Sequence, residues 1–293
     1  MTGTFMAEEI ASQPARWRAA TALTSDFAEK LPAAGARVAV VGCGTSWFIG
    51  QAYAVLRESA GLGETDAFAA SEFPIGRKYD HVIALSRSGT TTEVLGLLAK
   101  LRGTLPTTAV TGVPAEIAAS VDEVVDLSAA DERSVVQTRF ATTALAVLRT
   151  HLGEDLAPVI AQAEQVLARP VEDALASAGQ FSFLGTGWSV GIANEAALKF
   201  REACLFWTES YPAWEYRHGP ISISEPGRVT WMFGQAPEGL AEDVARAGGR
   251  FECSGLDPLA DLVRAQLVAG EIARRRGLDP DNPRSLTRSV VLT

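Results

Sequence analysis

The chain has 293 residues, of which 47% are apolar and 21% are charged, a composition typical of a folded globular protein with a substantial core. Its apolar runs fall well short of the roughly 18 residues that a membrane-spanning helix needs, which excludes a transmembrane protein. The formal net charge of −9 argues against a nucleic-acid-binding protein, because phosphate backbones are held by basic surfaces. A small phosphorylated ligand remains compatible, since backbone N–H groups and hydroxyls can bind it locally.

The amino-terminal residues and the cysteines indicate the compartment. The start MTGTFMAEEIASQ has neither the basic segment nor the apolar run of a secretory signal, so we expect a cytoplasmic protein. Cys43, Cys204 and Cys253 occupy separate apolar contexts without a C-x-x-C pair. This pattern favours reduced, buried thiols over disulfides or a zinc site.

In the first half, short apolar runs alternate with longer periodic segments, as in βαβ units on a parallel sheet. We expect strands at residues 37–42, 81–86, 106–112 and 122–127. We expect helices at residues 46–61, 91–103 and 114–120, and one long helix at residues 134–153.

The second half restarts the same pattern. We expect a connecting helix near residues 154–178, strands at 181–185, 228–234 and 249–255, and a helix at 189–207. VVGCGTSWFIGQAYAVLRE (40–58) aligns with FLGTGWSVGIANEAALKFR (183–201) at a fixed offset, so each half opens with a strand, a G-x-G turn, a serine and a helix. The sequence therefore predicts an α/β protein with two similar subdomains.

Two turns at predicted strand ends are the first candidate site. GCGTS (42–46) and SRSGTT (86–91) both follow strands, where ligands bind in open parallel sheets. The G-x-G turns lack the third glycine of a dinucleotide-binding motif, so a nucleotide cofactor is disfavoured. Ser86, Ser88 and Thr91 would instead offer donors to a phosphate at the start of a helix. The alternative is that these hydroxyls only cap that helix.

Three charged residues in the second half are the next candidates. NEAALKFRE places Glu195, Lys199 and Glu202 on one face of the expected helix. They could form a surface ion-pair ladder. The apolar residues around them indicate a buried helix instead, in which a carboxylate is a candidate general base.

A histidine in a loop completes the candidates from the residues themselves. His218 lies in EYRHGP (215–220), bounded by Gly and Pro. A histidine beside a ligand pocket can shuttle protons near neutral pH. His81, at the start of an apolar strand, and His151, at a helix end, are weaker candidates.

These segments together resemble the sugar isomerase (SIS) family, and most closely the isomerase domain of glucosamine-6-phosphate synthase and related glucosamine-6-phosphate deaminases. The matching segments follow the family's order over almost the whole chain: EIASQP (9–14), GCGTS, ASEF (70–73), SRSGTT, ERSVVQTRFATT (132–143), EAALKFRE, EYRHGP and DNPRSLTRSVVLT (281–293).

The resemblance implies two flavodoxin-like subdomains, each a parallel sheet flanked by helices, with a carboxyl-terminal tail over the active site. We expect residues 1–152 to form an amino-terminal helix and the first subdomain, 153–276 a linker helix and the second subdomain, and 277–293 the tail. The family implies a homodimer whose active site is shared between subunits, and it implies no cofactor and no metal.

The resemblance also implies roles for individual residues. The residues implied to bind the sugar and its phosphate, or to lie beside them, are Gly44, Thr45, Ser46, Ser86, Arg87, Ser88, Thr91, Val135, Gln137, Glu195 and Arg288. Glu202 matches the base that moves a proton between C1 and C2, with Lys199 as its helical neighbour. His218 matches the histidine that assists ring opening, and it would reach in from the partner subunit.

Departures from the synthase pattern bear on the reaction. The glutaminase domain and its catalytic cysteine have no counterpart in the sequence, so we do not expect glutamine to supply ammonia. Arg87 stands where the synthase carries glutamine, and Arg139 where it carries lysine. Arg288 replaces the lysine that forms a Schiff base with the ketose, and arginine, which stays protonated, cannot take that role.

We therefore expect an enzyme that acts on a hexosamine 6-phosphate, first among them a deaminase-isomerase that converts glucosamine 6-phosphate into fructose 6-phosphate and ammonia. A dehydratase of N-acetylglucosamine 6-phosphate and a simple aldose-ketose isomerase share its first step and remain alternatives. A non-catalytic sugar-phosphate sensor is a further alternative, disfavoured because both Glu202 and His218 are present.

Overall fold

The computed structural model describes residues 3–292, so the first two residues of the predicted range 1–152, and Thr293 of the predicted tail, lie outside the described residues. The chain divides into two compact units. The first unit comprises residues 15–133, residues 137–156 and the tail from Thr287. The second unit comprises the residues up to Pro14, residues 134–136 and residues 157–286. No helix in the described range is long and apolar enough to span a bilayer.

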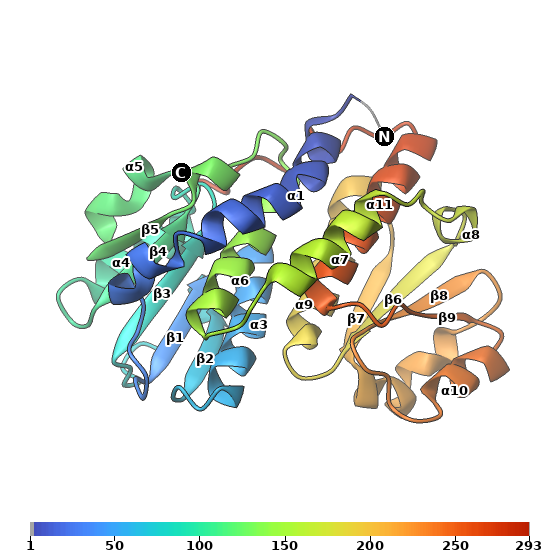
Figure 1. Ribbon diagram of the computed structural model, residues 1–293, viewed down its shortest axis with the longest axis horizontal. Coiled ribbons are helices and arrows are strands. Elements are labelled where there is room, and N and C mark those ends of the chain that lie inside the picture. Colours follow the sequence, from blue (N-terminus) through green and yellow to red (C-terminus); the bar gives the residue numbers. More distant parts are fainter. Residues whose placement is uncertain (1–2, 293) are drawn as a thin grey trace. The chain divides into compact units, whose positions relative to one another are not determined.

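The first unit is built on one parallel sheet (Figure 1). Its strands are β1 (Val38–Gly42), β2 (Thr65–Ala69), β3 (His81–Ser86), β4 (Thr107–Thr111) and β5 (Glu123–Asp126), in the order β2-β1-β3-β4-β5. Four of these strands lie where the sequence predicted them. The prediction missed β2, which is an edge strand with partly exposed side chains and so lacks the apolar run of a buried strand.

Helices and 3₁₀ turns complete the first unit, and α1 (Phe5–Thr21) contributes residues to both units. They are α2 (Thr24–Phe27), η1 (Ala28–Lys30), α3 (Thr45–Ser59), η2 (Ala70–Glu72), α4 (Thr92–Leu101), α5 (Pro114–Ile117), η3 (Ala118–Ser120), η4 (Ser128–Ala130) and α6 (Arg139–His151).

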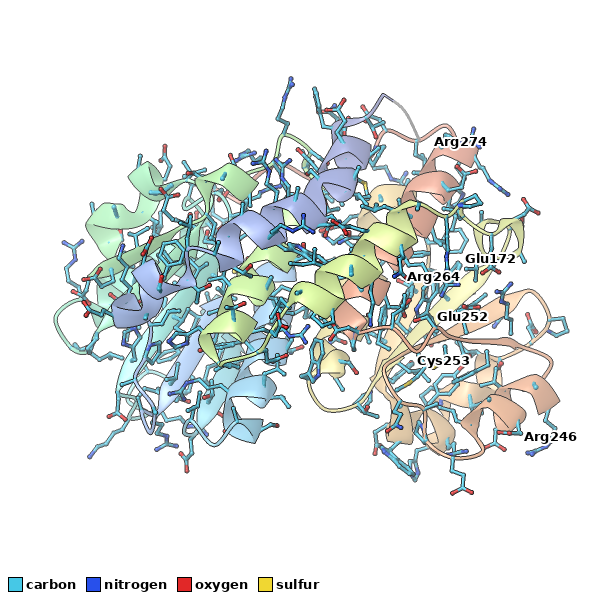
Figure 2. All side chains as sticks on the ribbon, in the orientation of Figure 1. Glu172, Arg246, Glu252, Cys253, Arg264 and Arg274 are labelled. Atoms are coloured by element: carbon cyan, nitrogen blue, oxygen red, sulfur yellow. The ribbon has the colours of Figure 1, made fainter. Side chains whose placement is uncertain are left out.

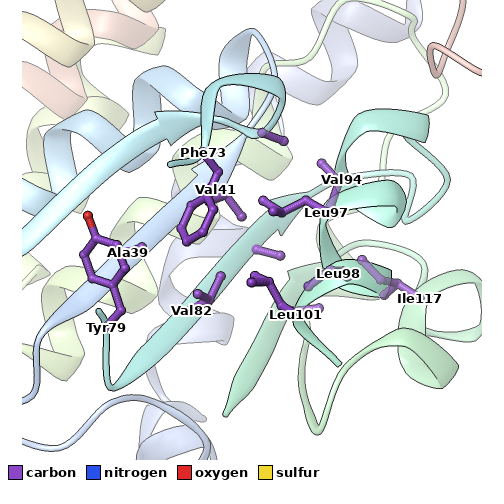
Figure 3. Packing of buried hydrophobic residues seen from close by; sticks show 13 residues of the cluster. Ala39, Val41, Phe73, Tyr79, Val82, Val94, Leu97, Leu98, Leu101 and Ile117 are labelled. Carbon is purple, nitrogen blue, oxygen red and sulfur yellow. The ribbon is translucent and has the colours of Figure 1, made fainter. Parts of the chain in front are cut away.

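Alternation along the strands distributes the first sheet's apolar residues between its two faces. Ala39 and Val41 of β1 join a cluster with α4, which supplies Val94, Leu97, Leu98 and Leu101 (Figure 3). On the other face α3 packs against β1, where a Cβ added to Gly50 would lie 3.0 Å from Val40 Cγ1. The small residue therefore lets α3 lie close to the sheet.

The second unit repeats this arrangement. Its strands are β6 (Gln180–Gly185), β7 (Thr208–Pro212), β8 (Arg228–Phe233) and β9 (Arg250–Cys253), parallel in the order β7-β6-β8-β9. Its helices and turns are α7 (Ala157–Leu167), α8 (Asp173–Ala176), α9 (Ser189–Cys204), η5 (Ala213–His218), η6 (Pro220–Ile223), α10 (Leu240–Arg246) and α11 (Pro258–Arg275). The strand order matches β2-β1-β3-β4 of the first sheet, which confirms the predicted α/β fold with two similar subdomains. Here too the edge strand, β7, was missed.

Two predicted helices are wrong in extent. The long helix predicted from residue 134 begins only at Arg139, because the Glu132 carboxylate accepts hydrogen bonds from the backbone N–H groups of Thr138, Arg139 and Phe140 and so caps α6. The single connecting helix is broken into α7 and α8. Pro170 between them has no N–H to donate and disfavours helical geometry in the residue before it.

The cysteines only partly meet their expectation. Cys204 is buried, and burial raises the pKa of its thiol to about 12. Cys43 is half-buried, whereas Cys253, at the end of β9, is exposed. The expectation of three buried thiols is therefore wrong for Cys253.

A network of alternating charges ties α11 to β9 and to Glu172, which precedes α8 (Figure 2). Arg264 of α11 pairs with Glu252 at 2.6 Å and with Glu172 at 3.2 Å, and its guanidinium lies over the ring of Trp231. Beneath it, Asp261 is 1% exposed and accepts a hydrogen bond from Trp231 Nε1 at 2.8 Å. Burial raises the pKa of Asp261 from 3.8 to about 6.

Replacing Asp261 with asparagine should flatten the pH dependence of stability. The folded chain binds this proton more tightly than the unfolded chain, so the free energy of unfolding should fall as the pH rises from about 4 to about 6. Asp261→Asn removes this pH-dependent contribution and should raise the free energy of unfolding at neutral pH by up to about 3 kcal/mol. Urea unfolding at several pH values measures this, with the exposed Asp26→Asn as control. A pH slope in Asp261→Asn equal to that of the parent would contradict the assignment.

Candidate functional site

The first predicted loop joins β1 directly to α3. A Cβ on Gly42 would lie 2.8 Å from the backbone carbon of Ser46, and Gly44 has a φ of 53°, so both positions require glycine. The turn leaves Thr45 and Ser46 buried in the first turn of α3. Cys43 adds no charge to this loop, because burial, and then the nearby Glu93 carboxylate, raise the pKa of its thiol.

The second loop joins β3 to α4 and is organised by its own hydroxyls. Ser86 Oγ accepts a hydrogen bond from Gly89 N, and Ser88 Oγ accepts from both Thr90 N and Thr90 Oγ1. Thr91 is the N-cap residue of α4, yet its side chain makes no capping hydrogen bond. Ser86 and Ser88 therefore shape the loop, and the hydroxyl cluster is not explained by helix capping.

The two loops share one edge of the sheet. β1 and β3 pair directly and in parallel, with Val41 opposite Ala84. The carboxyl ends of both strands, and the helix amino-termini that follow them, therefore lie side by side. This is the arrangement that binds anions at the edge of a parallel sheet.

The tail lies against the second loop. Ser289 Oγ lies 3.1 Å from Ser88 Oγ and 2.9 Å from Thr90 Oγ1. Arg87 is 2% exposed, and its Nη2 donates to the carbonyl oxygen of Arg288 at 2.8 Å. Of this tail, the sequence predicted only Arg288 as a site residue, and Ser289 was missed.

Arg288 and Gln137 have different surroundings in the first unit. The Arg288 guanidinium pairs with the Asp131 carboxylate at 2.6 Å, and nothing in the sequence singled out Asp131.

Gln137 lies just before α6, and its buried Oε1 has no hydrogen-bond partner among residues 3–292. An unpaired buried acceptor is costly and is typical of a position that a ligand completes. Val135 belongs to the second unit, where its N–H donates to Asp281 O.

Glu195, Lys199 and Glu202 of α9 form one cluster in the second unit. Lys199 Nζ lies 3.4 Å from Glu195 Oε1 and 2.5 Å from Glu202 Oε2. The side chains of Glu195 and Lys199 are 0% and 1% exposed, whereas that of Glu202 is 20% exposed. The surface-ladder alternative is therefore wrong. Glu202 is the member of the cluster that a ligand can reach, and Lys199 holds its carboxylate.

His218 ends η5, and its side chain is exposed. The neighbouring Arg217 fixes the turn, because its guanidinium donates to Asp243 Oδ2 at 2.6 Å and to Glu238 O at 2.8 Å. The following Gly219 has a φ of 134°, which glycine adopts without strain. The expected approach of His218 from a partner subunit stays a prediction.

The second G-x-G turn differs from the first in its serine. Ser189, which aligns with Ser46, is buried, and its hydroxyl accepts from Thr186 N and contacts the carbonyl oxygens of Thr186 and Phe233, each at 2.9 Å. The hydrogen-bonding capacity of this hydroxyl is used within the protein. The turn of the first sheet is therefore the better candidate for binding an anion.

Comparison with known proteins places this geometry in context. No family model matches the chain. It is similar to glutamine–fructose-6-phosphate aminotransferases (isomerizing): 28% identical over 295 residues to that of Sulfurisphaera tokodaii, covering 87% of this chain and 50% of that protein. It is 30% identical over 321 residues to that of Gloeobacter violaceus, covering 87% and 52%. The chain thus spans about half the length of the curated relatives it matches.

The fold agrees with a solved structure over its full length. The glucosamine-6-phosphate deaminase of Thermotoga maritima superposes with a TM-score of 0.87 at 23% identity, covering 99% of this chain and 100% of that chain. At this identity the likeness concerns the fold. The sequence relatives support the resemblance to the sugar isomerase (SIS) family that the motifs indicate, and the fold agrees with it.

Proposed function

We propose that the protein is an amino-sugar-phosphate enzyme that acts on an open-chain hexosamine 6-phosphate, with glucosamine 6-phosphate as the first substrate to test. The observation that carries this proposal is the α9 cluster, in which the buried Lys199 holds a partly exposed Glu202 carboxylate. A carboxylate fixed in this way can act as a general base. The names of the sequence relatives specify fructose 6-phosphate and isomerisation for those proteins, which supports the substrate class.

The proposed binding site for the phosphate is the edge where β1 and β3 end. The amino-termini of α3 and α4 lie at that edge, where the helix dipoles favour an anion. The first N–H group of α4, that of Thr92, donates to the tail carbonyl of Val290, so the N–H groups that follow it would serve the phosphate. Ser46, Ser86, Ser88 and Thr91 supply hydroxyl donors. Because this site relies on backbone N–H groups and hydroxyls, it is compatible with the overall charge of −9.

The proposed reaction proceeds by ring opening, removal of the C2 proton and loss of the amino group. His218 assists ring opening, which exposes the C1 aldehyde and acidifies the C2 proton. Glu202 removes that proton, the electron pair forms a C1–C2 double bond, and the aldehyde oxygen takes a proton from water to become a hydroxyl. Glu202 then returns its proton to C1, the amine gives one proton back to the solvent as the C2 imine forms, and water hydrolyses this imine to fructose 6-phosphate and ammonia. Donors at the site stabilise the charge that develops in the first step.

Product analysis separates the possible reactions. Incubation with glucosamine 6-phosphate should release ammonia and fructose 6-phosphate in equal amounts. A new ultraviolet chromophore from N-acetylglucosamine 6-phosphate, without ammonia, would indicate dehydration instead. Ketose without ammonia would indicate simple isomerisation. Micromolar binding of both sugars with no product from either would indicate a sensor and refute the enzyme proposal.

Glu202→Gln should abolish exchange of the C2 proton with solvent while it leaves binding of glucosamine 6-phosphate nearly unchanged. The amide keeps the size of the side chain but cannot accept the proton. Exchange is followed by NMR in deuterated water, and binding by calorimetry. Glu123→Gln, an exposed carboxylate on β5, is the matched control. Exchange at the parent rate in Glu202→Gln would remove Glu202 as the base.

The role of Lys199 can be separated from its contribution to folding. Lys199→Met leaves Glu195 as a buried charge without its counter-ion and should destabilise the protein by about 3–5 kcal/mol in urea unfolding. Adding Glu195→Gln removes that charge and should recover much of the stability. The double variant should nevertheless stay impaired in C2 proton exchange, because Glu202 has lost the ammonium that holds it. Parent-like exchange in the refolded double variant would make Lys199 purely structural, and Lys100→Met on α4 is the surface control.

A further inference from the structure

Two arginines of the first unit hold the tail against the hydroxyl-rich loop. Arg87, buried after β3, donates from Nη2 to the carbonyl oxygen of Arg288 at 2.8 Å. The Arg288 side chain donates in turn from Nη2 to both carboxylate oxygens of Asp131, at 2.6 and 2.7 Å, and from Nη1 to the carbonyl oxygen of Glu132. Each guanidinium is therefore committed to a contact between chain segments.

The segment that carries Asp131, the ion-pair partner of Arg288, is itself held in place. Arg139 donates to the carbonyl oxygens of Ala130 and Asp131. Asp131 also lies close to the end of β4, since a Cβ on Gly112 would come within 3.1 Å of Asp131 Oδ1 and of the carbonyl oxygen of Arg87. A side chain at position 112 would displace the carboxylate, so glycine lets Asp131 approach the loop that follows β3.

The held tail continues along the start of α4. Thr92 N donates to Val290 O at 3.2 Å, and Leu292 N donates to Thr92 Oγ1 at 2.9 Å. Between this pairing and Arg288, the Ser289 hydroxyl contacts Ser88 and Thr90. The tail thus adds one hydroxyl to the cluster that we propose binds the phosphate.

We propose that Arg87, Asp131 and Arg288 form a tail clamp, whose task is to place Ser289 in the phosphate site. This inference rests on the proposed function, because it takes the hydroxyl cluster as the binding site. The clamp residues are positioning residues: Arg288 acts on the substrate through the tail and not by direct contact. Arginine suits both positions, because a planar guanidinium can bridge several oxygens where a lysine ammonium is a single point charge.

The clamp also accounts for two departures from the synthase pattern together. Arg87 replaces a glutamine and Arg288 replaces a lysine in that pattern, and in this chain the side chain of one holds the backbone of the other. Where the synthase pattern has a reactive lysine amine, this chain therefore has an arginine that anchors the tail to Asp131. Arg139, the third departure, supports the same segment through the carbonyl of Asp131.

Hydrogen exchange tests the clamp without any reliance on turnover. Asp131→Asn and Arg288→Met should each accelerate exchange of the Thr92 and Leu292 amides roughly fivefold, the size expected for loss of one partly exposed ion pair. The double variant should be no worse than either single variant, because both changes break the same contact. Arg284→Met, an exposed tail arginine, is the matched control and should leave these amides unchanged. Parent-like exchange in both clamp variants would overturn the proposal.

Kinetics with glucosamine 6-phosphate then test the link to binding. Asp131→Asn should raise KM roughly fivefold with little change in kcat, since the substrate loses a positioned hydroxyl but keeps its base. Ser289→Ala should raise KM similarly while the exchange of the tail amides stays normal. If Arg288→Met raised KM but Asp131→Asn did not, Arg288 would contact the substrate directly and the clamp proposal would be wrong. Accelerated exchange together with no turnover of any sugar phosphate would confirm the clamp and refute the proposed function.

Discussion

The direct parallel pairing of β1 with β3 is the contact on which the proposed phosphate site depends. It brings the G-x-G turn and the hydroxyl-rich loop to the same edge, although more than one element of the chain separates them. Gly42 and Gly44 then allow α3 to start at once, because a side chain at Gly42 would collide with Ser46. Two helix amino-termini and several hydroxyls therefore lie at one edge of the sheet. The tail pairs with the start of the second helix, α4.

The α9 cluster in the second unit depends on a different constraint, the burial of charge. Lys199 and Glu195 are removed from water almost completely, and a charge is stable in such surroundings only when it is paired. Glu202 is joined to this pair through the same ammonium but retains contact with solvent. Helix α9 thus joins a fully buried carboxylate, Glu195, and a partly exposed one, Glu202, to the same lysine.

The two halves share a topology but differ in the surroundings of the serine in the G-x-G turn, and the tail from Thr287 belongs only to the first unit. The Ser189 hydroxyl is hydrogen-bonded to its own turn and to β8. In the first sheet, the loop after β3 contacts Ser289 of the tail instead. In this chain the arginines near that tail contact other protein groups: Arg87 holds a carbonyl and Arg288 holds Asp131. Substitutions that look like changes of a substrate ligand can therefore be changes in how a segment is anchored.

The α/β class, the two similar halves and most strands could be predicted from local sequence patterns, because buried strands and amphipathic helices leave periodic apolar patterns. The same patterns pointed to the two loops, the α9 cluster and His218 as candidates. Edge strands β2 and β7 were missed, since they are partly exposed and carry no long apolar run, and α6 begins late because the Glu132 side chain from the preceding loop caps it. The contacts of Ser88 and Thr90 with Ser289, and of Arg288 with Asp131, become visible only in the folded chain, because contacts across more than a hundred residues leave no local signal.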